Sequence, residues 1–372
     1  MAKPEQDRKT DDAAALVAVD RTAHDLRRGQ PVMIADAGAA VIAIAAELVS
    51  DLAITRLREL TGADPDLALT HHRAKVLKVR LYTEDVVLVP LPDWLTGEAA
   101  RAMADPTADL ANPLRGPFSA RRDGVSPATL AAVQLAKISR LLPAVVTATA
   151  PEGFDASDHG LLSVAAAHVM AYETAASQAL IRVTSAHMPL ADAGDARVVA
   201  FRSPDGGREH LAVVIGDPPT DAPVLVRMHS ECFTGDLIGS LKCDCGEQLR
   251  SAIERIGAEG NGILLYLRQE GRGIGLINKL RAYALQDQGF DTVEANERLG
   301  FESDERVFAP AAEMLRQLGY SRVRLMPNNP DKMTALDGYG IEVTERVPHA
   351  FPANDHNAFY LSTKKKKSGH LL

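Results

Sequence analysis

The spacing of apolar residues predicts mainly helices in the first half of the chain. Apolar positions recur at helical spacing over residues 13–28, and Gly29 is expected to end that helix. A short apolar run at residues 31–35 predicts a strand. Residues 105–125, rich in proline and glycine, are the expected internal loop. Further alanine-rich runs predict helices at residues 98–103, 127–142 and 161–179. This half is therefore predicted to be an Ala-rich α/β domain.

The pattern changes near residue 181, where short strand-like runs begin to alternate with turns. Strands are expected at residues 198–201, 211–215, 224–228, 262–267, 322–326 and 341–347. Helices are expected at residues 246–256, 274–288 and 306–318. Because strands and helices mix without a regular βαβ order, this half is predicted to be an α+β domain of mixed strands and helices.

This change of pattern sets the expected domain boundary close to residue 185. We expect a disordered lead over residues 1–12, an N-terminal domain over residues 13–185 and a C-terminal domain over residues 186–372. The two domains would each be long enough to bury a core.

Charge and apolar content exclude some classes of protein. The formal net charge of −8 argues against a general nucleic-acid binder, which needs a broad basic surface. Charged residues interrupt the two most apolar stretches, 39–48 and 130–150, before either reaches membrane-spanning length. The first twelve residues lack the apolar core of a signal peptide. We therefore expect a cytoplasmic protein without a nucleic-acid or membrane partner.

All three cysteines of the chain lie within fourteen residues, as Cys232, Cys243 and Cys245. An odd, clustered set in a chain without a signal peptide is a poor disulfide framework. Thiolates favour zinc, and three protein ligands leave the fourth tetrahedral position to water, as in catalytic sites. The spacing therefore favours one catalytic Zn²⁺ per chain. Two alternatives remain open, which are a structural site closed by His229 and three buried thiols without a metal.

Several longer motifs give the cysteines a context. Residues 227–236 (RMHSECFTGD) and 240–246 (SLKCDCG) resemble the metal-site signature of the GTP cyclohydrolase II family. Residues 266–275 (YLRQEGRGIG), 279–287 (KLRAYALQD) and 291–296 (DTVEAN) are similar to further motifs of that family, in the same order. The resemblance covers roughly residues 182–372, and the number of motifs makes it specific.

The resemblance implies a hydrolase of riboflavin biosynthesis that acts on GTP. Water is added at C8 of guanine, that carbon is lost as formate, and pyrophosphate is released, which leaves a ring-opened pyrimidinone ribotide. The family also implies Zn²⁺, Mg²⁺ with the triphosphate, and a homodimer. Two alternatives are kept: a paralogue that acts on another nucleotide or stops at a formylated intermediate, and a zinc- and GTP-binding regulatory protein without turnover.

The family's functional residues map onto positions of this chain. The resemblance implies that Tyr283 assists proton transfer at C8, that Asp304 accepts a proton, and that Arg306 attacks the α-phosphorus. The implied GTP contacts are Arg227, Met228, His229, Ser230, Glu231, Gln248, Glu270, Gly271, Arg272, Thr292 and Lys332. Glycines beside Arg272 would allow close approach of the backbone to phosphate.

Two positions qualify this assignment. Read locally, Ser303 and the acids after it predict the start of a helix. A cation at Arg306 is unfavourable near such a start unless a phosphate is bound there. Pro327 stands where the family commonly has a threonine that touches GTP, and proline offers neither a hydroxyl nor a backbone N–H.

The N-terminal half faintly resembles a second enzyme. Residues 23–36 are similar to the first helix and strand of 3,4-dihydroxy-2-butanone 4-phosphate synthase, which is fused to this enzyme in some relatives. The acidic, magnesium-binding run that follows in that family is replaced by residues 37–44 (AGAAVIAI). We therefore expect this half to be a non-catalytic scaffold, and we read His71 and His72 as a surface pair.

Overall fold

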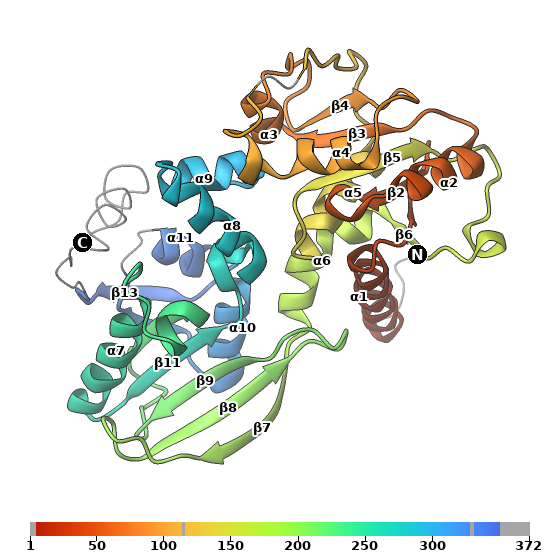
Figure 1. Cartoon of the computed structure of the whole chain (residues 1–372). Helices are drawn as coiled ribbons and strands as arrows, with labels where there is room; N and C mark the ends of the chain where they lie inside the picture. Colours follow the sequence, from red (N-terminus) through yellow and green to blue (C-terminus); the bar gives the residue numbers. More distant parts are fainter. Residues whose placement is uncertain (1–4, 114–115, 328–330, 350–372) are drawn as a thin grey trace. The chain divides into compact units, whose positions relative to one another are not determined.

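The computed structural model describes residues 5–113, 116–327 and 331–349 (Figure 1). Contacts divide the chain into two units. The first consists of Met1–Tyr172 and Ile277–Glu305, and the second of Glu173–Leu276 and Arg306–Leu372. This division differs from the boundary expected near residue 185, because residues 277–305 attach to the N-terminal half. Both units combine helices with a sheet, which confirms the predicted fold class.

The first unit is built on a six-stranded sheet in the order β4-β3-β5-β2-β1-β6. Its neighbouring strands are antiparallel, except for the parallel pair β1 and β6. Every residue of β2 is buried, as are five of the six of β5, so these strands lie inside the unit and are apolar on both faces. The strands are β1 (Val32–Ala35), β2 (Val41–Ala45), β3 (Asp66–Thr70), β4 (Val86–Pro90), β5 (Ala144–Thr149) and β6 (Ser163–Ala165).

Helices of the first unit begin at residues that cap them. Ser50, Thr70, Thr96 and Ser126 each accept a backbone N–H from the first turn of the helix that follows. The helices before residue 172 are α1 (Glu5–Arg27), α2 (Asp51–Thr61), α3 (His71–Val76), α4 (Gly97–Ala104) and α5 (Pro127–Ile138), and α6 (Ala166–Gln178) contains the boundary between the two units. Apolar residues of α1 and α5 pack together with the sheet in one core.

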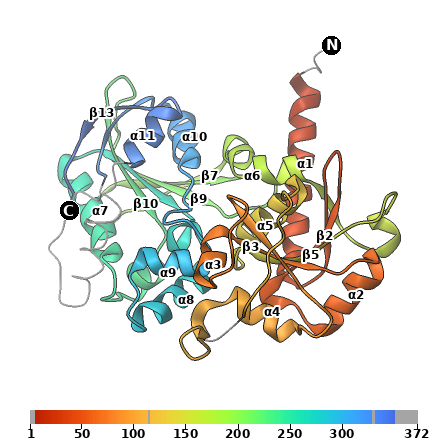
Figure 2. The same cartoon turned by 90° about the horizontal axis from the view of Figure 1, so that it is seen from above.

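Residues 277–305 belong to the first unit through specific contacts. They contain most of α8 (Leu276–Asp287) and all of α9 (Thr292–Leu299), which lies beside α3 in Figure 2. Arg281 forms ion pairs with Asp105 at 3.1 Å and Glu47 at 3.3 Å. Gly300 is so close to Thr70 that a Cβ there would lie 2.7 Å from its Oγ1. The two segments of this unit therefore pack closely together.

The second unit is built on a seven-stranded sheet in the order β13-β12-β10-β11-β9-β8-β7. The four strands from β13 to β11 are parallel, and the remaining pairs are antiparallel. The strands are β7 (Ile181–His187), β8 (Ala196–Arg202), β9 (His210–Ile215), β10 (Val224–Ser230), β11 (Gly262–Leu267), β12 (Arg322–Leu325) and β13 (Glu342–Arg346).

Helices cover both faces of this sheet. On one face, α10 (Ala309–Leu318) and α11 (Asp331–Gly338) lie next to each other (Figures 1 and 2) and share a core with Val224, Val226 and Met228 of β10. On the other face, α7 (Cys245–Glu259) packs on Leu225 of the same strand. Because side chains alternate along a strand, Arg227 and His229 point to the face that α7 covers.

Three local expectations are corrected by the structure. Helix α1 begins at Glu5, so residues 5–12 of the expected disordered lead belong to a helix. The helix expected at residues 127–142 ends at Ile138, and the apolar residues after it form β5. The helix expected at residues 306–318 begins at Ala309. No helix in the described part of the chain is long and apolar enough to cross a membrane.

Candidate functional site

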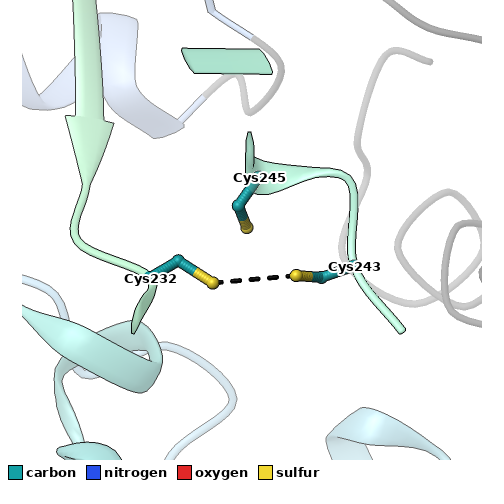
Figure 3. A group of neighbouring side chains, drawn as sticks. All are labelled: Cys232, Cys243 and Cys245. Atoms are coloured by element: carbon teal, nitrogen blue, oxygen red, sulfur yellow. Dashed lines mark hydrogen bonds between the residues drawn. The ribbon is translucent and has the colours of Figure 1, made fainter. Parts of the chain in front are cut away.

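The three cysteines come together at the end of β10, as Figure 3 shows. Cys232 follows β10, Cys243 lies in the loop before α7, and Cys245 is the first residue of α7. Their sulfur atoms all lie within 4.8 Å of one another, and those of Cys232 and Cys243 are 3.7 Å apart. Cys232 and Cys243 are buried, and Cys245 is partly exposed.

Two glycines allow the cysteine segments to approach each other. Between Cys232 and Cys243, the chain passes through the short helical segment η4 (Phe233–Leu237). A Cβ at Gly235 would lie 2.9 Å from Cys243 Sγ, and a Cβ at Gly246 would lie 2.2 Å from Gly235 O. Neither position therefore has space for a side chain, and the sulfur cluster depends on both.

The thiol chemistry of this cluster fits zinc. Cys232 raises the pKa of Cys243, and Cys232 and Cys243 together with burial raise the pKa of Cys245 well above its usual value. A dication would reverse these shifts, because it favours thiolates. Two sulfurs bound tetrahedrally to one Zn²⁺ are about 3.8 Å apart, given Zn–S bonds of about 2.3 Å. The Cys232–Cys243 distance matches that geometry.

His229 is not part of this sulfur cluster. Its Nε2 lies 3.0 Å from Oδ1 of Asp236, and only 3 % of its side chain is exposed. Among the described residues, the group that could hold a metal consists of the three cysteines. The alternative of a structural site closed by His229 therefore has no support in this arrangement.

A buried polar cluster lies on the same face of the sheet as α7. Arg227 donates to the carbonyl of Met326 at 2.8 Å and to Oε1 of Gln248 at 2.5 Å. Gln248 in turn donates to the carboxylate of Asp244. Burial lowers the pKa of Arg227 to about 10, and the charge of Asp244 opposes this shift. The cluster thus holds a cation in a buried position.

The loop that contains Glu270, Gly271 and Arg272 is fixed from within. One carboxylate oxygen of Glu270 accepts the N–H of Phe233 at 2.6 Å, and the other accepts the N–H of Gly271 at 2.8 Å. Gly271 and Arg272 both have positive φ, of 64° and 57°. A non-glycine residue in this conformation is strained, and such strain is common in ligand-binding loops. The geometry therefore fits the expected role in nucleotide binding.

The remaining predicted contacts of the second unit lie around the end of β10. Nζ of Lys332 donates to the carbonyl of Met228 at 2.8 Å. Ser230 Oγ accepts from Gln269 at 3.2 Å. Glu231 forms an ion pair with Arg268 at 3.1 Å. The structure thus brings together, in one unit, Arg227, Met228, His229, Ser230, Glu231, Gln248, Glu270, Gly271, Arg272 and Lys332.

The other predicted residues divide between the units. Tyr283, Thr292 and Asp304 belong to the first unit, and Arg306 belongs to the second. The ammonium group of Lys279 lies 5.7 Å from the ring centre of Tyr283. Gln286 donates to the hydroxyl of Thr292 at 3.3 Å. A joint action of these residues with the cysteines stays a prediction.

Residues 303–306 do not form the helix start that the sequence predicted. They are irregular, and α10 begins three residues later, after Phe308, which provides no side-chain cap. Pro310 gives the physical reason. In a helix that began at Arg306, Pro310 would sit beyond the first turn, where it removes a hydrogen bond and clashes with the preceding turn. Ser303 therefore does not cap α10, and Asp304 and Arg306 lie in chain without regular secondary structure.

Sequence reasoning missed several residues of this region. Asp236, Tyr266 and His349 were not singled out, and neither was Asp244. Asp236 and Asp244 both lie inside the cysteine motifs, so proximity to the ligands was a usable signal. His349, by contrast, reaches the carbonyl of Gln248 at 3.1 Å from 101 residues away, which spacing does not reveal.

Comparisons with known proteins place the chain in a family. A family model described as GTP cyclohydrolase II matches residues 181–348. A GTP cyclohydrolase-2 from Azospirillum brasilense is 51% identical over 97% of this chain and 95% of its own length. The riboflavin biosynthesis protein RibBA of Bacillus subtilis is 56% identical over 49% of this chain and 46% of its own length.

Solved structures include a two-domain 3,4-dihydroxy-2-butanone 4-phosphate synthase from A. baumannii. It is 20% identical, has a TM-score of 0.36, and the match covers 89% of this chain and 99% of that one. The identity to the Azospirillum protein extends over almost the whole of both chains. The chain therefore belongs to the GTP cyclohydrolase II family of enzymes.

Proposed function

We propose that this protein hydrolyses GTP with one Zn²⁺ per chain, and releases formate and pyrophosphate as the first step of riboflavin biosynthesis. The convergence of three cysteine sulfurs at the end of β10 is the observation that carries this proposal. Three thiolates leave one tetrahedral position for water. Family membership supports GTP as the substrate.

Cys232, Cys243 and Cys245 would hold the zinc, which when bound supplies Lewis-acid activation of water for attack at C8. The cations Arg227, Arg272 and Lys332 would bind the triphosphate and guanine. All three lie in the second unit with the cysteines. Burial keeps Arg227 away from bulk water, which strengthens its attraction for an anion.

The residues implied for proton and phosphoryl transfer complete the proposal. Tyr283 would exchange a proton at the guanine ring, and Asp304 would accept one at the phosphate side. Arg306 would act at the α-phosphate, either as a charge or as a nucleophile. Guanidinium stays protonated unless strongly perturbed, so the nucleophilic role requires a separate test for a covalent adduct.

A second candidate function is a paralogue that accepts another nucleotide or stops at a formylated intermediate. Pro327 favours it, because this buried residue has neither the hydroxyl nor the N–H that a threonine would offer to GTP. One lost hydrogen bond would weaken binding by about 1 kcal/mol. Such a loss lowers affinity without changing the reaction, so hydrolysis of GTP remains the first proposal.

Incubation of the purified protein with GTP, Zn²⁺ and Mg²⁺, followed by mass spectrometry of the products, tests the proposal. We expect formate, pyrophosphate and the ring-opened pyrimidinone ribotide in equal amounts. A product that keeps the formyl group would support the second candidate. Unchanged GTP with zinc bound would contradict the first proposal and would leave a paralogue that accepts another nucleotide. Mg²⁺, a homodimer and a cytoplasmic location stay predictions from the resemblance and the sequence.

A further inference from the structure

A buried carboxylate, Asp236, connects the first cysteine to the sheet. One of its oxygens, Oδ2, accepts the backbone N–H of Cys232 at 3.0 Å and the hydroxyl of Tyr266 at 2.9 Å. Nε2 of His229 lies 3.0 Å from Oδ1 and 3.1 Å from Oδ2. Only 8 % of the Asp236 side chain is exposed. Such a carboxylate is tolerated in a buried position because several donors surround it.

Two of the three donors are fixed by the sheet. His229 of β10 and Tyr266 of β11 are register partners in the parallel pair, and their rings stack with centres 5.6 Å apart. Their polar atoms therefore reach Asp236 from neighbouring positions on one rigid surface. The position of the Asp236 carboxylate therefore depends on both strands, because it lies where these two donors meet.

The third donor belongs to the cysteine itself. Besides accepting the N–H of Cys232, Asp236 donates its own backbone N–H to the carbonyl of Cys232 at 2.7 Å. The N–H of Gly235, next to Asp236, lies 3.3 Å from Cys232 Sγ. Asp236 thus contacts the backbone of Cys232 on both sides, in the turn that directs Sγ toward Cys243.

We propose that Asp236 is a positioning residue of the metal centre: it fixes the backbone of Cys232 against β10 and β11 so that Sγ faces the other two sulfurs. This inference rests on the proposed function, because it takes Zn²⁺ as the ion that the three sulfurs bind. Partners of metal ligands that fix their orientation usually change metal affinity when they are replaced. A carboxylate that served stability alone would leave that affinity unchanged.

Substitutions separate the contributions of the three donors. Asp236→Asn keeps the size of the side chain but removes its charge and one acceptor oxygen, so all three contacts could be kept only if Nε2 of His229 became an acceptor. Tyr266→Phe removes one hydroxyl and leaves the contacts with Cys232 and His229. Asp221→Asn, at an exposed carboxylate of the same unit, is the matched control.

The test measures Zn²⁺ affinity of the full-length, metal-free protein by competition with a chromophoric chelator, and the absorption spectrum of the Co²⁺ form. Unfolding of each metal-free variant is measured in parallel. We expect Asp236→Asn to weaken Zn²⁺ binding by about 10- to 100-fold and to alter the Co²⁺ spectrum. Tyr266→Phe should cause a smaller loss, and Asp221→Asn none.

The inference would be overturned if Asp236→Asn had the same Zn²⁺ affinity and the same Co²⁺ spectrum as the unchanged protein, even if that variant unfolds more easily. Failure of the zinc site gives a different result, because the unchanged protein would then bind no Zn²⁺ at its cysteines. Failure of the GTP reaction alone would leave the Zn²⁺ affinities of all these proteins as expected here. If Asp236→Asn does not fold, Tyr266→Phe decides: unaltered affinity and spectrum in that variant would count against the role of the network.

Discussion

Nζ of Lys137 lies 2.7 Å from Oε1 of Glu305, although 168 residues separate them in the chain. About four-fifths of each side chain is shielded, with exposed fractions of 19 % and 20 %. The same carboxylate oxygen accepts the N–H of Glu302 at 2.9 Å. This ion pair joins the N-terminal half to the segment that contains Tyr283 and Asp304, within the first unit. The half expected to be non-catalytic therefore supports part of the predicted catalytic machinery.

Reversing the charge of Lys137 tests this support. Lys137→Glu would place two carboxylates together, and we expect a loss of about 1–3 kcal/mol in the free energy of unfolding. Formate release should fall as well, because residues 302–305 lose an anchor. The double variant Lys137→Glu, Glu305→Lys should recover most of both losses, as measured by urea unfolding and a formate assay. A double variant that only adds the two single losses would show that the pair is not coupled.

Replacing one cysteine tests the metal centre. Cys243→Ser exchanges a thiolate for a poor zinc ligand, so we expect bound zinc to fall from about one per chain to a small fraction. Formate release should be lost, while circular dichroism shows the fold retained. Metal analysis and activity measured on the same preparation check this. A metal-free protein that is fully active would refute the zinc mechanism.

Separate variants distinguish the ring from the phosphate chemistry. Tyr283→Phe removes only a hydroxyl, and formate release should fall by about 10²-fold, as for a lost acid–base group, while pyrophosphate release persists. Arg306→Ala should abolish pyrophosphate release, and Arg306→Lys should restore little of it because lysine lacks the planar fork. Formate and pyrophosphate are measured in parallel for each variant. Normal pyrophosphate release by Arg306→Ala would remove Arg306 from the phosphate site.

The stability of the second unit should depend on pH through His349. Burial, with the nearby charge of Arg227, lowers the pKa of His349 to about 4. The unfolded chain would bind a proton near its ordinary pKa of about 6.5, so stability is lost as pH falls from there toward 4. Urea midpoints between pH 7 and 4 should therefore fall less steeply in His349→Gln. Parallel curves for the two proteins would exclude this contribution.

The N-terminal half should form no dihydroxybutanone phosphate from ribulose 5-phosphate. Residues 37–44 contain no carboxylate, so this stretch offers neither the metal ligands nor the acid–base groups of that reaction. The purified protein with Mg²⁺ and ribulose 5-phosphate, analysed by mass spectrometry, provides the check. Detection of the product would show that other acidic residues take over this role.

Sequence patterns predicted the second unit better than the first. Strand β11 was predicted with its observed bounds, and α7 to within a few residues, because Gly262 marks the start of β11 and Gly260 follows the end of α7. Strands β2 and β5 were missed, since a strand buried on both faces has a continuous apolar sequence that resembles a buried helix. Alanine, abundant in both, favours the helical interpretation.

At the site, sequence reasoning found the residues with distinctive chemistry and missed those that hold them. The three cysteines were predicted from their spacing, and the structure brings their sulfurs together. Proximity to Cys232 was the one local signal for Asp236, and Tyr266 carries none, because the contact between them depends on strand register and on the distance between β10 and β11. The attachment of residues 277–305 to the first unit was likewise invisible, since ion pairs such as Arg281 with Glu47 span 234 residues.

Because the first unit consists of two separate segments of the chain, those segments cannot be exchanged independently between relatives. In a chimera joined near residue 180, residues 277–305 would come from one parent and the N-terminal half from another. Glu47, Asp105 and Lys137 would then need matching partners at Arg281 and Glu305. Recombination at that junction should therefore succeed only between parents that share these charges, so the two halves of the chain would tend to be inherited together.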